Sequence, residues 1–81
     1  MEIENLVKMA NDIANFFNSE PERATAIFGV SNHLRKFWDP RMRKAIVRHL
    51  EQGGAGLNDL AREAIAKLSR ESDSVRHVGD G

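Results

Sequence analysis

The residues best suited to chemistry are basic side chains gathered in the middle of the sequence. Residues 33–49 hold six arginines and lysines and one acidic residue, Asp39, although the formal net charge of the whole chain is zero. Three of the six follow the spacing of one helix face, and we call them the basic ridge: Arg41, Lys44 and Arg48. Such a ridge is a solvated helix face, a contact for an acidic protein or a contact for nucleic acid, and the sequence leaves these three interpretations open.

Nucleic acid is the least favoured partner of the basic ridge. A helix, a turn and a basic helix in succession form the outline of a helix-turn-helix reader. However, the turn carries Asp39-Pro40 in place of a glycine, and the first turn of the basic helix exposes no asparagine or glutamine that could read a base. The zero net charge also gives the chain no general attraction for nucleic acid.

The sequence offers no complete catalytic or metal-ligating set. It contains no cysteine, which excludes an iron–sulfur cluster of the all-thiolate kind, and His33 and His49 lack carboxylates at zinc-ligand spacing. No serine or threonine has the context of an activated nucleophile. The glycines of residues 53–56 follow no strand and precede no Gly-Lys-Thr, so they favour a helix stop over a phosphate-binding loop. We therefore expect no catalytic, cofactor-binding or metal-binding residue.

An aromatic residue outside its helix's apolar stripe is a second feature that indicates a partner. Phe28 lies about 100° from the middle of the stripe formed by its neighbours, and Phe16 is also off its stripe. Arg35 follows Phe28 by seven positions, so the two lie within about 20° of each other around a helix. Aromatic and arginine side chains are enriched at interface hot spots. We predict these partner-binding residues: Phe28, Arg35, Trp38, Arg41, Arg43, Lys44 and Arg48.

Helices must position these side chains, because apolar residues recur with a helical period along most of the chain. The pattern predicts a first helix over residues 2–18 and a second helix opened by a capping box at Ser19–Glu22. The second helix is expected to bury one apolar stripe: Ile27, Val30, Leu34, Phe37 and Trp38.

Asp39-Pro40 predicts a sharp corner after the second helix. A residue before proline avoids helical geometry, and Asp39 can cap a third helix whose first residue is Pro40. That helix is expected to end near Gln52, before the left-handed stop at Gly53-Gly54. It is expected to bury three residues, with Val47 at the margin: Met42, Ile46 and Leu50.

A fourth helix is expected to follow a cap at Asn58, with Leu57 packed against its first turn. No segment alternates with period two, so strands are not expected. The sequence thus predicts an all-α fold: a small bundle of four helices with a sharp Asp-Pro corner between the second and third. We expect residues 1–71 to form a single helical domain and residues 72–81 to be a disordered C-terminal tail.

Residues 33–43, His-Leu-Arg-Lys-Phe-Trp-Asp-Pro-Arg-Met-Arg, resemble the central motif of the delta subunit of NAD-dependent, molybdenum-containing formate dehydrogenases. Residues 9–17 and 53–57, together with several positions up to Leu68, are similar to the same family. The resemblance spans about residues 3 to 68 and is carried mainly by the run Phe37–Arg43. The predicted tail lies outside it.

The resemblance implies a small accessory subunit of a cytosolic complex that oxidises formate to carbon dioxide and passes electrons to NAD. In that family the large alpha subunit carries the molybdenum cofactor and iron–sulfur clusters, and other subunits carry FMN and further clusters. The delta chain would itself hold no cofactor and would dock on the large subunit to support its assembly or stability.

Two alternatives stay open beside this role. The first is a transient assembly factor that acts during cofactor insertion and is absent from the mature enzyme, and the second is a nucleic-acid-binding regulator. The acidic start, Met1–Glu4, differs from a secretory signal, and no apolar run reaches the roughly 18 residues of a membrane span. We therefore expect a cytoplasmic protein without a membrane partner.

Overall fold

The computed structural model describes the backbone of residues 2–80 and the side chains of residues 2–71. Within this part the chain forms four α-helices and no strand. Their bounds are α1 (Ile3–Phe17), α2 (Arg23–Phe37), α3 (Pro40–Glu51) and α4 (Asp59–Asp80). The prediction of an all-α fold with four helices and a corner at Asp39-Pro40 is confirmed.

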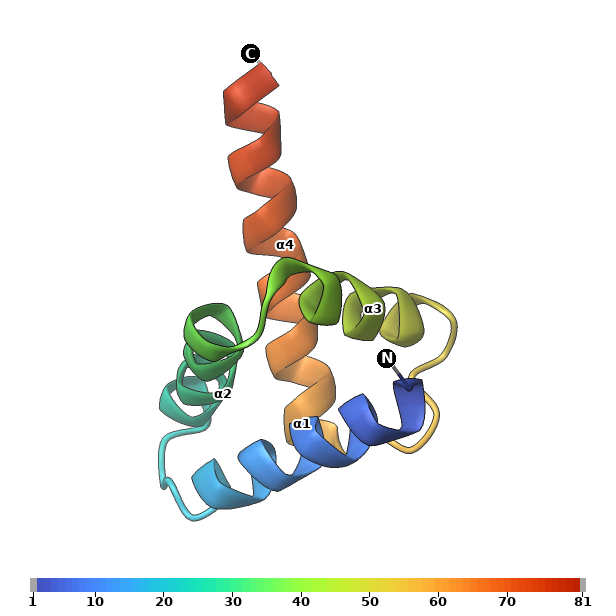
Figure 1. Cartoon of the computed structure of the whole chain (residues 1–81). Coiled ribbons are helices and arrows are strands. Elements are labelled where there is room, and N and C mark those ends of the chain that lie inside the picture. Colours follow the sequence, from blue (N-terminus) through green and yellow to red (C-terminus); the bar gives the residue numbers. More distant parts are fainter. Residues whose placement is uncertain (1, 81) are drawn as a thin grey trace.

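Helix α4 is the central element of the fold. It packs against α1, α2 and α3, and its most extensive contact is with α2. Figure 1 shows the first half of α4 surrounded by the other three helices and its C-terminal half projecting away from them. The predicted disordered tail falls on residues whose side chains lie outside the described part, while the backbone of α4 continues to Asp80. The domain boundary at residue 71 stays a prediction.

The core lies along the inner face of α4. Five side chains of α4 are buried there: Leu60, Ala61, Ala64, Ile65 and Leu68. Helices α1, α2 and α3 add buried side chains that face them: Leu6, Ala10, Ala14, Ala26, Val30, Leu34 and Ile46. Many of these residues are alanines, which allow the helix backbones to approach closely and leave little volume for large side chains. The core is accordingly small and depends on α4.

Two side-chain caps fix where α3 and α4 begin. The Asp39 carboxylate accepts a hydrogen bond from the backbone N–H of Met42 at 3.0 Å. The Asn58 side-chain oxygen accepts from the N–H of Ala61 at 2.8 Å. Each cap satisfies a backbone donor that the first turn of a helix leaves without a helical partner. Both predicted caps are confirmed.

Side chains of α1 and α4 hold the loop between α3 and α4. Gly53 and Gly54 have positive φ angles of 117° and 64°, which confirms the left-handed stop predicted after α3. Arg62 of α4 donates to the carbonyl oxygens of Gly53 at 3.0 Å and Gly54 at 2.9 Å. Asn11 of α1 donates to the carbonyl oxygen of Gly56 at 2.9 Å and accepts from the N–H of Asn58 at 2.9 Å. The loop is therefore a fixed part of the domain.

The start of α2 differs from the prediction. The helix begins at Arg23, and its N-terminal flanking residue, Glu22, makes no side-chain cap bond. The predicted capping box at Ser19–Glu22 is wrong because the turn that ends α1 uses this segment. The N–H of Glu20 donates to the carbonyl oxygen of Phe17 at 3.1 Å, so Ser19 lies inside that turn instead of at a helix start.

Of the two aromatic residues that end the predicted stripe of α2, Trp38 is buried as predicted and Phe37 is not. Phe37 is 72% exposed, whereas Trp38 is only 4% exposed and belongs to the core. The helix ends at Phe37, and Trp38 takes an extended backbone with φ −92° and ψ 139°. Because the chain changes direction there, helical spacing no longer decides which side chain points inward. The prediction that Phe37 is buried is wrong.

Candidate docking surface

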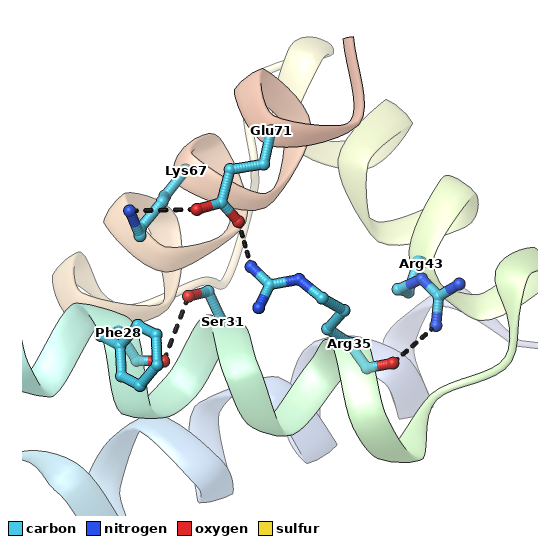
Figure 2. A network of polar contacts seen from close by, with 6 residues as sticks. All are labelled: Phe28, Ser31, Arg35, Arg43, Lys67 and Glu71. Carbon is cyan, nitrogen blue, oxygen red and sulfur yellow. Dashed lines mark hydrogen bonds and ion pairs between the residues drawn. The ribbon is translucent and has the colours of Figure 1, made fainter. Parts of the chain in front are cut away.

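The Asp-Pro corner is closed by Arg43 of α3. Its guanidinium donates to the backbone carbonyl oxygen of Arg35 at 3.1 Å and to that of Trp38. These carbonyls lie at the end of α2, where the helix offers them no further N–H donors. Figure 2 shows the Arg43 side chain reaching the backbone of Arg35. We therefore assign Arg43 to the corner, and its contact with a partner stays a prediction.

Trp38 is another of the predicted partner-binding residues, and it belongs to the core of this chain. Its side chain packs inside the core beneath the corner and offers almost no surface. The structure confirms the predicted burial of Trp38, and its docking role stays a prediction. Burial of its large ring anchors the corner to the remainder of the domain.

Arg35 ties α2 to α4 through a cluster of charges. Its guanidinium pairs with the carboxylate of Glu71, whose second oxygen accepts from Lys67 at 3.1 Å. Figure 2 shows the Arg35 side chain directed toward α4 and Glu71 held between the two cations. Burial raises the pKa of Glu71, but the Lys67 hydrogen bond and the charges of Arg35 and Lys67 outweigh it and lower the pKa below its ordinary value.

Phe28 and Phe16 are exposed, as their off-stripe positions predict. Phe28 is 53% exposed on α2 and Phe16 is 76% exposed at the end of α1. Phe16 also meets the ring of Phe17 edge to face, with ring centroids 5.1 Å apart. Arg35 directs its guanidinium toward Glu71, and a surface that it shares with Phe28 stays a prediction.

Phe37 is the exposed aromatic residue that sequence reasoning missed. Its ring lies against His33, with centroids 4.7 Å apart, and forms one wall of an apolar hollow beside the corner. Helices α1, α2 and α3 and the corner residue Trp38 all contribute to that hollow: Met9, Asp12, Ile13, His33, Phe37, Trp38 and Met42. The only feature of the sequence that could have indicated the exposure of Phe37 is its position immediately before the corner, where helical periodicity ends.

The basic ridge is exposed on α3, as predicted. The ridge lines a second hollow. The other residues that line it are Ile3 of α1 and three residues in or directly after α3: Ala45, His49 and Gln52. Among the side chains of residues 2–71, the ion pairs involve other cations: Lys8, Arg23, Arg35 and Lys67. Within residues 2–71, no acidic side chain pairs with the ridge, so its charges are available to a partner.

The described residues contain no cluster of three or more histidine, cysteine, aspartate or glutamate side chains placed to hold a metal ion. His49 instead contacts the carbonyl oxygen of Ala55 through its Nε2 atom at 2.8 Å and so supports the α3–α4 loop. None of the helices in the described part of the chain combines the length and the hydropathy that a bilayer crossing requires.

A family model matches residues 5–65 of this chain, and its description is NADH-dependent formate dehydrogenase delta subunit FdsD. The chain belongs to this family. The FdsD match runs from α1 into α4 and includes the corner, the three exposed phenylalanines and the basic ridge. It confirms the resemblance noted for residues 33–43. No curated protein and no solved structure matches the chain.

Proposed function

We propose that this chain is a non-catalytic accessory subunit of a cytoplasmic, NAD-dependent formate dehydrogenase complex. It docks on the large subunit, which carries the molybdenum cofactor, and supports the assembly or stability of that subunit. The observation that carries this proposal is the FdsD family match over residues 5–65. The molybdenum cofactor, the iron–sulfur clusters and FMN belong to the other subunits, and this chain contributes a surface.

The exposed phenylalanines support a docking role. Phe16, Phe28 and Phe37 each expose more than half of their surface, in a chain whose core is small. Burying an aromatic or large aliphatic side chain contributes about 1.5–3 kcal/mol. A partner that covers these rings therefore gains free energy that the isolated chain cannot gain. The basic ridge on α3, which forms no ion pair with another side chain of residues 2–71, adds a positive charge that steers an acidic partner toward the chain.

Co-purification from cells that produce all subunits tests the proposal. We expect one copy of this chain per large subunit after gel filtration of the active enzyme. Recovery of the chain only with the cofactor-free large subunit would instead support a transient assembly factor. Absence of the chain from both forms of the large subunit would refute docking altogether.

A further inference from the structure

Residues of both α1 and α3 line each of the two hollows. Ile3, at the start of α1, lines the hollow that includes Arg48 and Gln52 near the end of α3. Met9 and Ile13, further along α1, line the hollow that includes Met42 at the start of α3. The order of residues is thus opposite on the two helices. We call the two hollows together the α1–α3 seam.

The seam is apolar at one end and cationic at the other. Around the apolar end lie Met9, Ile13, Phe37 and Met42. At the cationic end the basic ridge borders Ile3 and Ala45, which are only half-buried. The acidic residue that lines the seam is Asp12, and Lys8 engages it at 3.2 Å. The lining residues thus leave an excess of positive charge along an incompletely covered apolar strip.

We propose that the α1–α3 seam receives an acidic amphipathic helix of the partner subunit. Its apolar side chains cover the Phe37 end, and its carboxylates face Arg41, Lys44 and Arg48. A strip flanked by two helices matches the groove in which an amphipathic helix buries one face. Helix α3 has 12 residues, so it spans about 18 Å, and a partner helix of about three turns is long enough to follow it. This inference deepens the docking role and rests on it.

Charge reversal within the seam provides the first test, using the complex assembled from all subunits. The double variant Arg41→Glu/Arg48→Glu is expected to raise the Kd for the large subunit at least tenfold. The control Lys36→Glu/Arg70→Glu makes the same change in net charge at exposed positions that line neither hollow, and we expect less than a twofold effect. Circular dichroism must show wild-type helix content for both. Equal weakening by the two variants would overturn the proposal.

Site-directed cross-linking provides the second test. The chain has no cysteine, so Ala45→Cys introduces a single thiol in the seam for a photoreactive label. Ala24→Cys places the same label on an exposed position of α2 that lines neither hollow. Within the assembled complex we expect the Ala45→Cys label to cross-link a helix rich in aspartate and glutamate. The Ala24→Cys label should give no such product.

The outcomes separate this proposal from the docking role. If the unmodified chain fails to associate with the large subunit, the proposed function fails and this inference fails with it. If the complex forms but the Ala45→Cys label reacts only with solvent, a second copy of this chain, nucleic acid or a segment without acidic excess, the seam proposal alone is overturned. Mass spectrometry of the cross-linked peptide identifies the outcome.

Discussion

Gly29 of α2 lies directly against the aromatic ring of Phe17 of α1. A Cβ atom at Gly29 would come within 2.5 Å of one ring carbon of Phe17 and 2.6 Å of another. The missing side chain therefore allows α1 and α2 to approach. This contact is close to the exposed Phe16 and Phe28, so the packing of two helices determines how those rings are presented.

Gly29→Ala should destabilise the domain although alanine is the better helix former. The exchange gains about 1 kcal/mol of helix propensity, but forcing a methyl group into a packed contact costs about 1–3 kcal/mol. We expect a net loss of about 1 kcal/mol in the free energy of unfolding, measured by urea denaturation. Adding Phe17→Leu should recover part of the loss by making room. A Gly29→Ala variant that is more stable than the wild type would show that the Phe17 ring moves aside freely.

The Asp39 cap at the corner predicts a ranking of two neighbouring substitutions. Asp39→Ala removes the acceptor for the Met42 N–H and should cost about 1 kcal/mol. Pro40→Ala should cost less, because proline at the first helical position mainly presets one backbone angle. Thermal melts of the two variants give the comparison. A clearly larger loss for Pro40→Ala would contradict the assignment of Asp39 as the main stop and start signal.

Alanine substitutions of the two adjacent aromatic residues at the corner should differ strongly in their effect on the free energy of unfolding. Trp38→Ala removes a buried ring and should cost about 3–5 kcal/mol, enough to unfold much of a small domain. Phe37→Ala removes an exposed ring and should change the free energy of unfolding by less than about 0.5 kcal/mol. The same Phe37→Ala variant should weaken binding to the large subunit. Chemical denaturation and a binding assay on both variants distinguish the core residue from the surface residue.

Phe28 should matter for binding more than for folding. Truncating an interface aromatic anchor commonly costs at least about 1 kcal/mol of binding free energy, and Phe28 is more than half exposed in the isolated chain. Phe28→Ala should therefore weaken association with the large subunit while leaving the circular dichroism spectrum nearly unchanged. We expect Arg35→Ala to weaken binding too, by at least about 1 kcal/mol, and to lower stability as well, since Arg35 pairs with Glu71. Wild-type affinity in the Phe28→Ala variant would exclude this ring from the interface.

The charge cluster at Glu71 predicts a specific pH dependence. The pKa of Glu71 is lower in the folded chain than in the unfolded chain, so its ionised form favours folding. This contribution is fully present above the ordinary glutamate pKa and is lost as the pH falls through the lowered one. The stability advantage of the wild type over Glu71→Gln should therefore be largest near neutral pH and shrink toward pH 3. A stability advantage that grows on acidification would instead show that folding raises the pKa of Glu71.

Local sequence signals account for much of the fold and for less of the surface. The Asp39 and Asn58 caps and the glycine stop at Gly53 were predictable because each depends on residues within a few positions. The exposure of Phe37 was not predictable in this way, because it follows from a backbone turn that ends helical periodicity.

The roles of the arginines depended on partners that are distant in sequence or are backbone atoms. Arg35 meets Glu71 across 36 positions, and Arg43 binds carbonyl oxygens that any residue type could supply. The basic ridge was predictable because charge and helical spacing alone place it on the outer face of α3. Its position beside α1, which forms the seam, required the packed structure.

The central position of α4 has a consequence during protein synthesis. The inner faces of α1, α2 and α3 are completed by Leu60, Ile65 and their neighbours, which the ribosome adds after those three helices. A nascent chain that has not yet reached α4 therefore exposes its apolar stripes as well as its surface phenylalanines. Exposed apolar surface of this kind makes an incomplete chain prone to aggregation until α4 has left the ribosome and can pack. Premature termination in the α3–α4 loop should consequently leave no folded fragment able to compete for the large subunit.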